Sequence, residues 1–363
     1  MSDIGRSGSR FGDQSPWVAR AAIAVVVVIF AFTLAAPNVL NPPQKAPANT
    51  YTDWQLYRDI AKRVQAGQGY YRAAATEQRA HGYPTYPWAT FRQPGQSLLL
   101  AALRTHTVQW GVIGTLAVVA MLLVRGALDQ TSLSTGRKLA ATLLMGTGLF
   151  EVRDSASPYF HEAWACVLIL ASLACHRPKR FVASVTLCVA ACLFRETAAL
   201  YLLVMFAFSV FERRWREAAA WAAGAAIFGA ALGAHIYFAA QQRAPGDMAS
   251  NGWLRFGGWP FIFATLRTND FIRFLPAWMV AVVACAAGLG LAGARDRWAA
   301  RVAATTFAYV GVFAIIGRPD NGYWGLMYAP LLPLGLVYAD GAIVDLVRRA
   351  ATRQAHSPLP DRV

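Results

Sequence analysis

Charged side chains are scarce in this chain: only 15% of its 363 residues are Asp, Glu, Lys or Arg, compared with about 25% in soluble domains. Acids are the scarcer kind, with 19 Asp and Glu against 34 Lys and Arg, which gives a net charge of +15. Because 56% of the residues are apolar, the composition argues against a soluble globular protein and favours a protein that has lipid as its solvent.

Cysteine is also scarce, and its spacing excludes two classes of site. The five cysteines lie in or beside apolar runs, and none forms a Cys-x-x-Cys pair. This arrangement indicates buried free thiols, not a disulfide framework or a metal site. The chain has no His-Glu-x-x-His sequence, which excludes the usual zinc-protease signature.

The positive charge does not predict a nucleic-acid partner. Lys and Arg residues fall between apolar runs and form no separate basic patch, so we expect no nucleic acid to bind. Residues placed in this way act as signals for membrane topology. We therefore expect membrane lipids to surround most of the chain.

Apolar runs predict an all-α, polytopic membrane bundle of about ten transmembrane helices, since a crossing helix needs about 20 residues and fewer inside a bundle. We place the crossings near 17–37, 106–125, 138–151, 159–175, 181–194, 197–211, 217–239, 275–293, 300–316 and 324–344.

The distribution of Lys and Arg predicts the orientation. Most of them lie in alternate loops and in both termini, whereas the other short loops carry only Arg153, Arg195 and Arg318. Because positive loops stay in the cytoplasm, we expect both termini there and two long loops, 38–105 and 240–274, outside. The predicted organisation is a disordered head (1–16), a transmembrane domain (17–348) and a cytoplasmic tail (349–363).

The first outer loop contains the stretch TDWQLYRDIAKRVQAGQGYY. Its apolar residues recur at helical spacing with polar residues opposite, which predicts an amphipathic helix on the membrane surface that ends at Gly67 and Gly69. Asp53 begins this helix and has two interpretations. The Thr52-x-x-Gln55 spacing fits a capping box with a structural role, whereas a carboxylate at the surface could also serve as a general base.

Further polar residues gather in the predicted outer loops. A charge near the bilayer centre costs about 2.5–3.5 kcal/mol, so such residues are usually paired or functional. The structural alternatives are a simple ion pair in a turn for Arg195–Glu196 and a solvated helix end for His161–Glu162. The residues concerned are Glu151, Arg153, Asp154, His161, Glu162, Arg195, Glu196, Arg318, Asp320, Asn321 and Tyr323.

Carboxylates and arginines beside lipid suit one chemistry. Arginine binds a phosphate as a planar fork, and a carboxylate can take the proton from a hydroxyl that attacks a sugar C1. The segments YTDWQLYRDIAKRVQAGQGYY, FRQPGQSLLLAAL and CLFRETAALYLLV resemble those of the GT-C superfamily of membrane glycosyltransferases. The resemblance covers about residues 15–215.

This resemblance implies a bacterial inner-membrane enzyme with a periplasmic active site. It would transfer a sugar from a polyprenyl-phosphate donor, with inversion, to an acceptor lipid, glycan or protein. Asp53 would be the catalytic base, and Arg58, Arg92, Arg195 and Arg318 would contact the donor phosphate. His161, Glu162, Glu196 and Tyr323 complete the predicted substrate-binding set. Trp54 stands where the family often has a second acid, which argues against metal dependence, while a divalent cation, Mg²⁺ or Mn²⁺, is the open alternative.

Two other classes of function remain open. A transporter or lipid flippase for envelope glycan precursors usually shows inverted repeats and polar residues at mid-membrane depth. The sequence shows no clear repeat, and its polar residues gather on one side. A non-catalytic scaffold for envelope assembly would tolerate joint substitution of the outer carboxylates and arginines.

Overall fold

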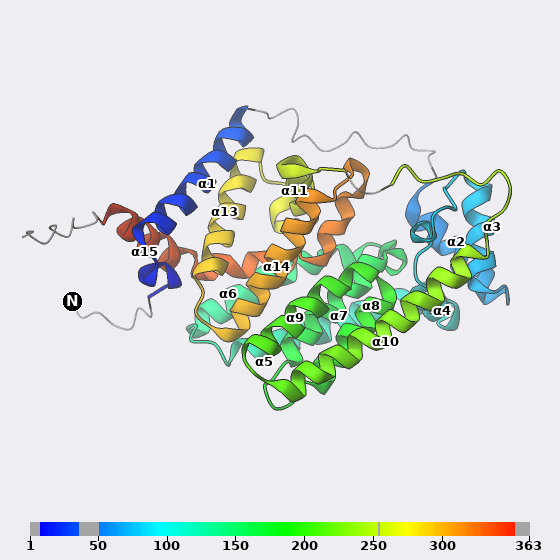
Figure 1. The fold of residues 1–363 in the computed structure, drawn as a ribbon, viewed down its shortest axis with the longest axis horizontal. Coiled ribbons are helices and arrows are strands. Elements are labelled where there is room, and N and C mark those ends of the chain that lie inside the picture. The colour runs from blue at the N-terminus through cyan, green and yellow to red at the C-terminus, as the bar shows by residue number, and fades with distance from the viewer. Residues whose placement is uncertain (1–7, 36–50, 253–254, 353–363) are drawn as a thin grey trace, which may run out of the picture.

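The computed structural model describes residues 8–35, 51–252 and 255–352 (Figure 1). Helices make up nearly all regular structure in these ranges, which contain no β-strand. Their one β-type pairing is an isolated parallel bridge between Tyr86 and Ala249. The predicted all-α class is confirmed.

The α-helices follow in chain order: α1 (Pro16–Ala35), α2 (Asp53–Gln65), α3 (Tyr70–Ala80), α4 (Gly95–Ala102), α5 (His106–Leu128), α6 (Thr135–Gly146), α7 (His161–Cys175), α8 (Val182–Phe194), α9 (Ala199–Phe211), α10 (Trp215–Ala240), α11 (Gly258–Leu266), α12 (Asp270–Arg273), α13 (Ala277–Gly293), α14 (Arg297–Ile315) and α15 (Ala339–Ala351). The 3₁₀ helices are η1 (Arg10–Asp13), η3 (Trp88–Thr90), η4 (Thr147–Arg153), η5 (Ser157–Tyr159), η6 (Glu196–Ala198), η7 (Pro319–Met327) and η8 (Leu332–Tyr338).

Within the described ranges, four helices are long and apolar enough to cross a membrane: α1, α5, α10 and α14. Asn321–Met327 and Leu332–Ala351 together are also long and apolar enough, with a bend of 53° between them, and would make a fifth crossing. Four shorter apolar helices, α7, α8, η6 with α9, and α13, accompany them. The helices are therefore compatible with a membrane protein.

Helix α7 lies at the centre of the bundle. Nearly all of its side chains are buried, including those of His161, Glu162 and Trp164 at its N-terminal end. A helix that is apolar all round is typical of such an enclosed position. Its most extensive packing is against α8 and α5, so the charges at its first turn are held inside protein.

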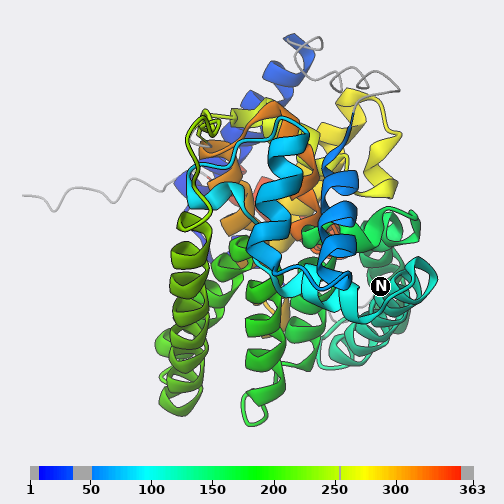
Figure 2. The ribbon, with the colours of Figure 1, turned by 90° about the vertical axis from the view of Figure 1, so that its right-hand side faces the viewer.

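Connections between the helices meet at two opposite ends. At the first end, which we call the outer end, the Trp259 indole donates to Thr33 Oγ1 (3.0 Å) and His106 Nε2 contacts the carbonyl of Ser155 (2.6 Å). Helices α2 and α3 lie at this end, beside the C terminus of α10 (Figures 1 and 2). The predicted outer loops therefore lie together.

The opposite, inner end joins the other connections. Ser132 N–H donates to Asp296 Oδ1 (3.1 Å), and the Trp298 indole donates to the Leu173 carbonyl (3.0 Å). Helix α15 also lies at this end, and Arg137 contacts its Asp340 (2.6 Å). The predicted inner loops thus meet one another as well.

The predicted disordered head, 1–16, differs from the structure over the part described. Residues 10–13 form η1, Phe11 is buried, and Ser9 N–H donates to Asp345 Oδ2 of α15 (2.6 Å). Arg295 adds an ion pair with Asp13 (2.7 Å). A buried aromatic ring and these polar contacts hold the segment on the inner end, a result that its Gly- and Ser-rich composition conceals.

The segment predicted as the last crossing, 324–344, is not one continuous helix in the structure. Proline lacks the N–H that an α-helix requires, and Pro330 and Pro333 split the segment into η7, η8 and α15. The Ala329 carbonyl, which would bond to residue 333 in an α-helix, instead accepts from Asn269 Nδ2 (2.9 Å). Asn269 is buried, so a side chain from another segment replaces the missing donor.

Glycines let this irregular segment run through the bundle. A Cβ at Gly335 would lie 1.9 Å from the Ala287 carbonyl oxygen of α13, and one at Gly290 would lie 1.9 Å from the Gly335 carbonyl oxygen. A Cβ at Gly148 would lie 2.3 Å from Pro330 N. Backbone therefore packs directly on backbone here, which only residues without a Cβ permit.

The predicted amphipathic helix of the first outer loop is α2. It buries Leu56, Ile60 and Ala61 against α3 and α4, and the chain turns at Gly67 with a φ of +91°. Arg79 of α3 forms a two-pronged ion pair with Asp247, with Nε–Oδ1 and Nη2–Oδ2 distances of 2.7 and 2.9 Å. The two long outer loops are thereby joined.

Candidate active site at the outer end

Helix α2 presents Asp53 to neighbouring elements without using it as a cap. The N-terminus of the helix is closed by Gln55, whose Oε1 accepts from Thr52 N–H at 2.8 Å. Asp53 instead accepts from two phenols: Tyr83 donates to Oδ1 (2.9 Å) and Tyr323 to Oδ2 (3.3 Å). The capping box and the polar site thus coexist, with separate residues for each.

A set of polar side chains surrounds this carboxylate, and we call it the outer cluster. Its members come from α2, the loop between α3 and α4, the first turn of α7, the α8–η6 junction and η7. They are Asp53, Tyr57, Tyr83, Arg92, His161, Glu162, Arg195, Glu196 and Tyr323.

Arg195 forms the buried part of the outer cluster. Its Nε lies 2.6 Å from Glu162 Oε1, and the two side chains are 1% and 2% exposed. Its Nη1 donates to Glu196 Oε1, and its guanidinium lies over the Trp324 ring, 5.7 Å from the centroid. Charges buried this deeply need partners, so Arg195 and Glu162 fix the α7 and α8 ends to each other.

Arg92 is the second guanidinium. Its Nε donates to the Tyr57 hydroxyl (3.1 Å), and its Nη1 lies 3.7 Å from Glu196 Oε1. Tyr70 donates to the Arg92 carbonyl (2.5 Å), which holds this part of the loop in place. Glu196, 29% exposed, therefore lies between the two arginines and connects the buried part of the cluster to the surface.

The phenols of the outer loop are neutral donors at physiological pH. Burial raises the pKa of Tyr57 to about 12. Burial, together with the nearby Asp53 carboxylate, raises the pKa of Tyr83 above its usual value. A carboxylate that accepts from neutral phenols is held in position without a cation to stabilise its charged form.

The charges of the cluster do not cancel. Its three carboxylates, Asp53, Glu162 and Glu196, face two guanidinium groups, which contact Glu162 and Glu196. Within the ranges that the structure describes, Asp53 forms no ion pair. Asp53 is therefore the carboxylate of the cluster that no described guanidinium neutralises.

His161 has an unusual environment. It is 1% exposed, and neither ring nitrogen has a hydrogen-bond partner among the described residues. The Tyr57 ring meets it edge to face, with centroids 4.6 Å apart. A buried polar group left unpaired costs about 1–3 kcal/mol, so this imidazole is kept at some cost to stability.

Two predicted site residues lie elsewhere. Arg58 points to the other side of α2, where it pairs with Asp59 (2.9 Å) and covers the Trp54 ring. Arg318 contacts the Gly252 carbonyl (3.4 Å) in the second outer loop. The other predicted residues, Asp53, Arg92, His161, Glu162, Arg195, Glu196 and Tyr323, come together in the outer cluster. The side chains of Glu151 and Asp320 are outside the described ones.

Two cluster residues had not been singled out from the sequence. Tyr57 lies four residues after Asp53, which places both on one face of a helix, so that signal was available. Tyr83 lies in the Gly- and Pro-rich stretch HGYPTYPW, where no periodicity shows which way a side chain points. Its role depends on how the loop folds back on α2.

A divalent cation does not fit the described side chains. Each cluster carboxylate is occupied by phenol or guanidinium donors, and no group of three His, Cys, Asp or Glu side chains among the residues described is arranged to hold a metal ion. We therefore derive no chemical step through a metal.

Comparison of the chain with protein-family models, with curated proteins and with solved structures found no match. A proposal about its activity accordingly rests on the chemistry of the outer cluster.

Proposed function

We propose that this protein is a membrane glycosyltransferase of the GT-C type, which transfers a sugar from a polyprenyl-phosphate donor to an acceptor hydroxyl. One observation carries the proposal: the Asp53 carboxylate is held by two phenols and no guanidinium, while Arg92 lies in the same cluster through Tyr57. The outer cluster thus offers both a base, Asp53, and a group that can bind phosphate, Arg92.

The proposed reaction is a single displacement. Asp53 takes the proton of the acceptor hydroxyl while its oxygen attacks C1 of the sugar. The bond between C1 and the phosphate oxygen breaks, and the lipid phosphate leaves with the electron pair. The Arg92 guanidinium stabilises the negative charge that develops on this phosphate, and attack opposite the leaving group inverts the configuration at C1.

Arg195 has a positioning role in this proposal. Both of its described carboxylate partners, Glu162 and Glu196, belong to the protein, and it is almost fully buried. It holds Glu196 beside Arg92, so that the partly exposed carboxylate and guanidinium keep a fixed separation. The substrate would meet Arg92, Asp53 and Glu196 before Arg195.

The proposed setting is a bacterial inner membrane crossed about ten times, with the outer cluster on the periplasmic side and both termini in the cytoplasm. The separation of the connections into two groups supports this arrangement. The concentration of Lys and Arg in the inner group supports it as well. The short helices α7, α8 and α9 would cross inside the bundle.

The test is a transfer assay on the full chain in proteoliposomes, with a panel of polyprenyl-phosphate sugars as donors. Asp53→Asn should lower transfer by about 10²–10⁴-fold, the usual contribution of a general base. Asp59→Asn is the matched control, since Asp59 lies on the same helix and pairs with Arg58 outside the cluster. Equal transfer by wild type and Asp53→Asn, at equal folded protein, would sink the assignment of Asp53.

One observation favours a second candidate, a transporter or flippase of lipid-linked glycan precursors. The last apolar segment is broken and bent by 53°, and broken helices are common in transporters. The same proteoliposomes separate the two functions. Movement of a lipid-linked sugar between leaflets without sugar transfer, unchanged in Asp53→Asn, would replace the glycosyltransferase proposal.

A further inference from the structure

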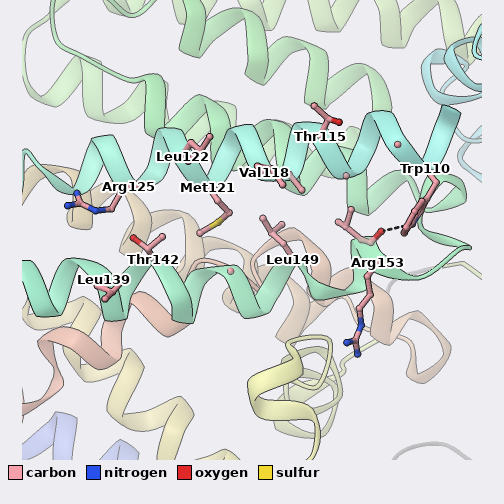
Figure 3. Close-up of a pocket in the computed structure, with 15 residues that line it drawn as sticks. Trp110, Thr115, Val118, Met121, Leu122, Arg125, Leu139, Thr142, Leu149 and Arg153 are labelled. Carbon is pink, nitrogen blue, oxygen red and sulfur yellow. Dashed lines mark hydrogen bonds between the residues drawn. The ribbon is translucent and has the colours of Figure 1, made fainter. Parts of the chain in front are cut away.

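A long groove separates α5 from α6 and η4, away from the outer cluster (Figure 3). Its volume is about 930 Å³, and its lining is almost entirely apolar. Glycines make it wide: a Cβ at Gly111 or Gly114 would meet nothing within 4 Å. The groove is open on the side where Val118 and Leu122 are exposed.

The shape and lining of this groove suit a hydrocarbon chain. Its lining residues run along α5 from Trp110 to Arg125, which corresponds to about 22 Å at 1.5 Å per residue. One leaflet of a bilayer contributes about 15 Å of hydrocarbon, half of the usual core thickness. A hydrocarbon chain of about 15 Å that enters at one end of the groove can therefore lie entirely inside it.

The two ends of the groove differ in how their cations are placed. At the inner end, Arg125 of α5 and Lys138 of α6 both contact Asp129 Oδ1, at 2.6 and 3.4 Å. Two cations, one from each helix, thus share one carboxylate and leave a positive charge beside this end, where Arg125 lines the groove. This matches a phosphate, which arginine and lysine both bind.

At the outer end, Arg153 also lines the groove, but its side chain points away from α5 (Figure 3). It contacts Asp270 Oδ2 at 3.2 Å. The Trp110 indole N–H donates to the Val152 carbonyl (3.1 Å) and so closes this end with an aromatic ring. Arg273 also contacts Asp270, with an Nη1–Oδ1 distance of 3.6 Å, so both ends carry a net positive charge. Because the indole closes the outer end and Arg153 points away from α5, the geometry favours a head group at the inner end.

We propose that the groove is a binding site for an anionic phospholipid, with an acyl chain along α5 and α6 and the phosphate on Arg125 and Lys138. Basic positions between membrane helices on the cytoplasmic side recognise acidic head groups in this way. The site is distinct from the proposed sugar-transfer site and does not depend on it. The lipid would brace α5, which packs on the central helix α7.

The experiment measures lipid binding to the delipidated full chain by native mass spectrometry. Phosphatidylglycerol and phosphatidylcholine with the same acyl chains are titrated separately. We expect phosphatidylglycerol to bind at least ten-fold more tightly. Arg125→Ala combined with Lys138→Ala should remove most of this preference, whereas Arg153→Ala, at the other end, should keep it.

A second variant tests the chain-binding part. Gly114→Leu fills the open space and should weaken binding of both lipids by at least ten-fold. Gly229→Leu on α10 is the matched control, since a Cβ there also meets nothing within 4 Å, and it should bind both lipids as wild type does. Circular dichroism and the thermal midpoint confirm that each variant is folded.

Two results would overturn the proposal. Equal binding of both lipids, unaffected by Gly114→Leu, would mean that only general membrane lipid coats this surface. Loss of phosphatidylglycerol binding in Arg153→Ala, with retention in the Arg125 and Lys138 variant, would place the head group at the outer end and contradict the inner-end assignment. Gly114→Leu keeps the test decisive even if the double variant fails to fold.

Discussion

The two ends of the bundle both bury ionised side chains, but they balance them differently. The inner network consists of His176, Glu212, Arg214, Glu217 and Arg301. Glu217 contacts His176 Nε2 and Arg214 Nη1, both at 2.8 Å, and Glu212 contacts Arg301 Nη2 at 2.7 Å and also Arg214. Two carboxylates thus meet two guanidinium groups.

The outer cluster uses the same residue types with a surplus acid. Asp53 has phenols where the inner carboxylates have guanidinium groups, and neither ring nitrogen of His161 has a hydrogen-bond partner among the described residues. A balanced set can serve packing alone, because each charge is satisfied inside the protein. The comparison indicates that the surplus carboxylate of Asp53 and the imidazole of His161, more than burial itself, distinguish a candidate site from a structural network.

The largest expected effect compares Arg195→Met with Arg301→Met. Arg195→Met leaves the buried Glu162 without its cation, which costs about 3–5 kcal/mol. Arg301→Met costs less, because Glu212 keeps its contact with Arg214. Both should lower the free energy of unfolding, measured by denaturant titration in detergent. Only Arg195→Met should also lower sugar transfer per folded molecule, because only Arg195 holds the outer cluster.

Equal loss of transfer in both variants, after correction for the folded fraction, would remove the distinction between the two ends. The double variant Arg195→Met with Glu162→Gln serves as the control for uncompensated charge. It should recover part of the lost stability without recovering transfer.

The next effect concerns His161. His161→Phe removes two ring nitrogens without described partners and keeps an aromatic ring against Tyr57, so it should raise the free energy of unfolding by about 1–3 kcal/mol. Sugar transfer should fall as well, because His161 is one of the predicted substrate-binding residues. His235→Phe is the control, since the Tyr71 hydroxyl contacts His235 Nδ1 (3.2 Å), and its loss should lower stability. A loss of stability in both variants would show that His161 is satisfied.

A smaller effect is expected where neither network takes part. Asn269→Leu removes the donor to the Ala329 carbonyl and the acceptor for Thr147 Oγ1 and Phe271 N–H. It should cost at least about 1–2 kcal/mol, the range of a single hydrogen bond between membrane helices. Thermal unfolding measures the change, and transfer per folded molecule should stay within two-fold of wild type. A large loss of transfer at unchanged stability would link the irregular segment to the outer cluster directly.

The smallest effect is the acid dependence of α2. Although burial opposes it, hydrogen bonds from Arg58, Lys62 and Tyr51 hold the pKa of Asp59 at about 2, below its ordinary value of 3.8. The folded protein thus favours the ionised form, so this stabilisation is present above about pH 3.8 and is lost as the pH falls to about 2. A pair near the surface contributes less than about 1 kcal/mol.

The thermal midpoint between pH 5 and pH 2 tests this contribution. The difference between wild type and Asp59→Asn should be greatest at pH 5 and vanish near pH 2. A constant difference across this range would show that Asp59 acts through packing alone.

Much of the fold could be predicted because apolar runs and helix boundaries are local signals. Each predicted crossing falls on one or more helices, and α2 begins at Asp53, where the capping pattern places it. The breaks within 324–344 could not be predicted in this way, because the sequence cannot reveal that Asn269, far away in the chain, supplies the donor missing at Pro333.

Part of the candidate site could likewise be predicted from local signals in the sequence, and part could not. Asp53, Arg195 and Glu196 could be singled out because charges beside apolar runs are rare. Their spatial neighbours could not, since Tyr83 reaches Asp53 across 30 positions of the chain and Tyr323 across 270. The position of Arg58 outside the outer cluster could not be predicted, because a helical face cannot be oriented from sequence until its packing partners, α3 and α4, are known.

The irregular segment of residues 319–338 has a consequence for how the protein is made. Bilayer hydrocarbon offers no hydrogen-bond partner for backbone carbonyls freed by proline, and here the Asn269 side chain supplies one. This stretch is therefore a poor substrate for one-at-a-time insertion during synthesis. It should leave the translocation channel only after the segment that carries Asn269 is in place, so residues 319–338 would pack into a bundle whose preceding helices are already inserted.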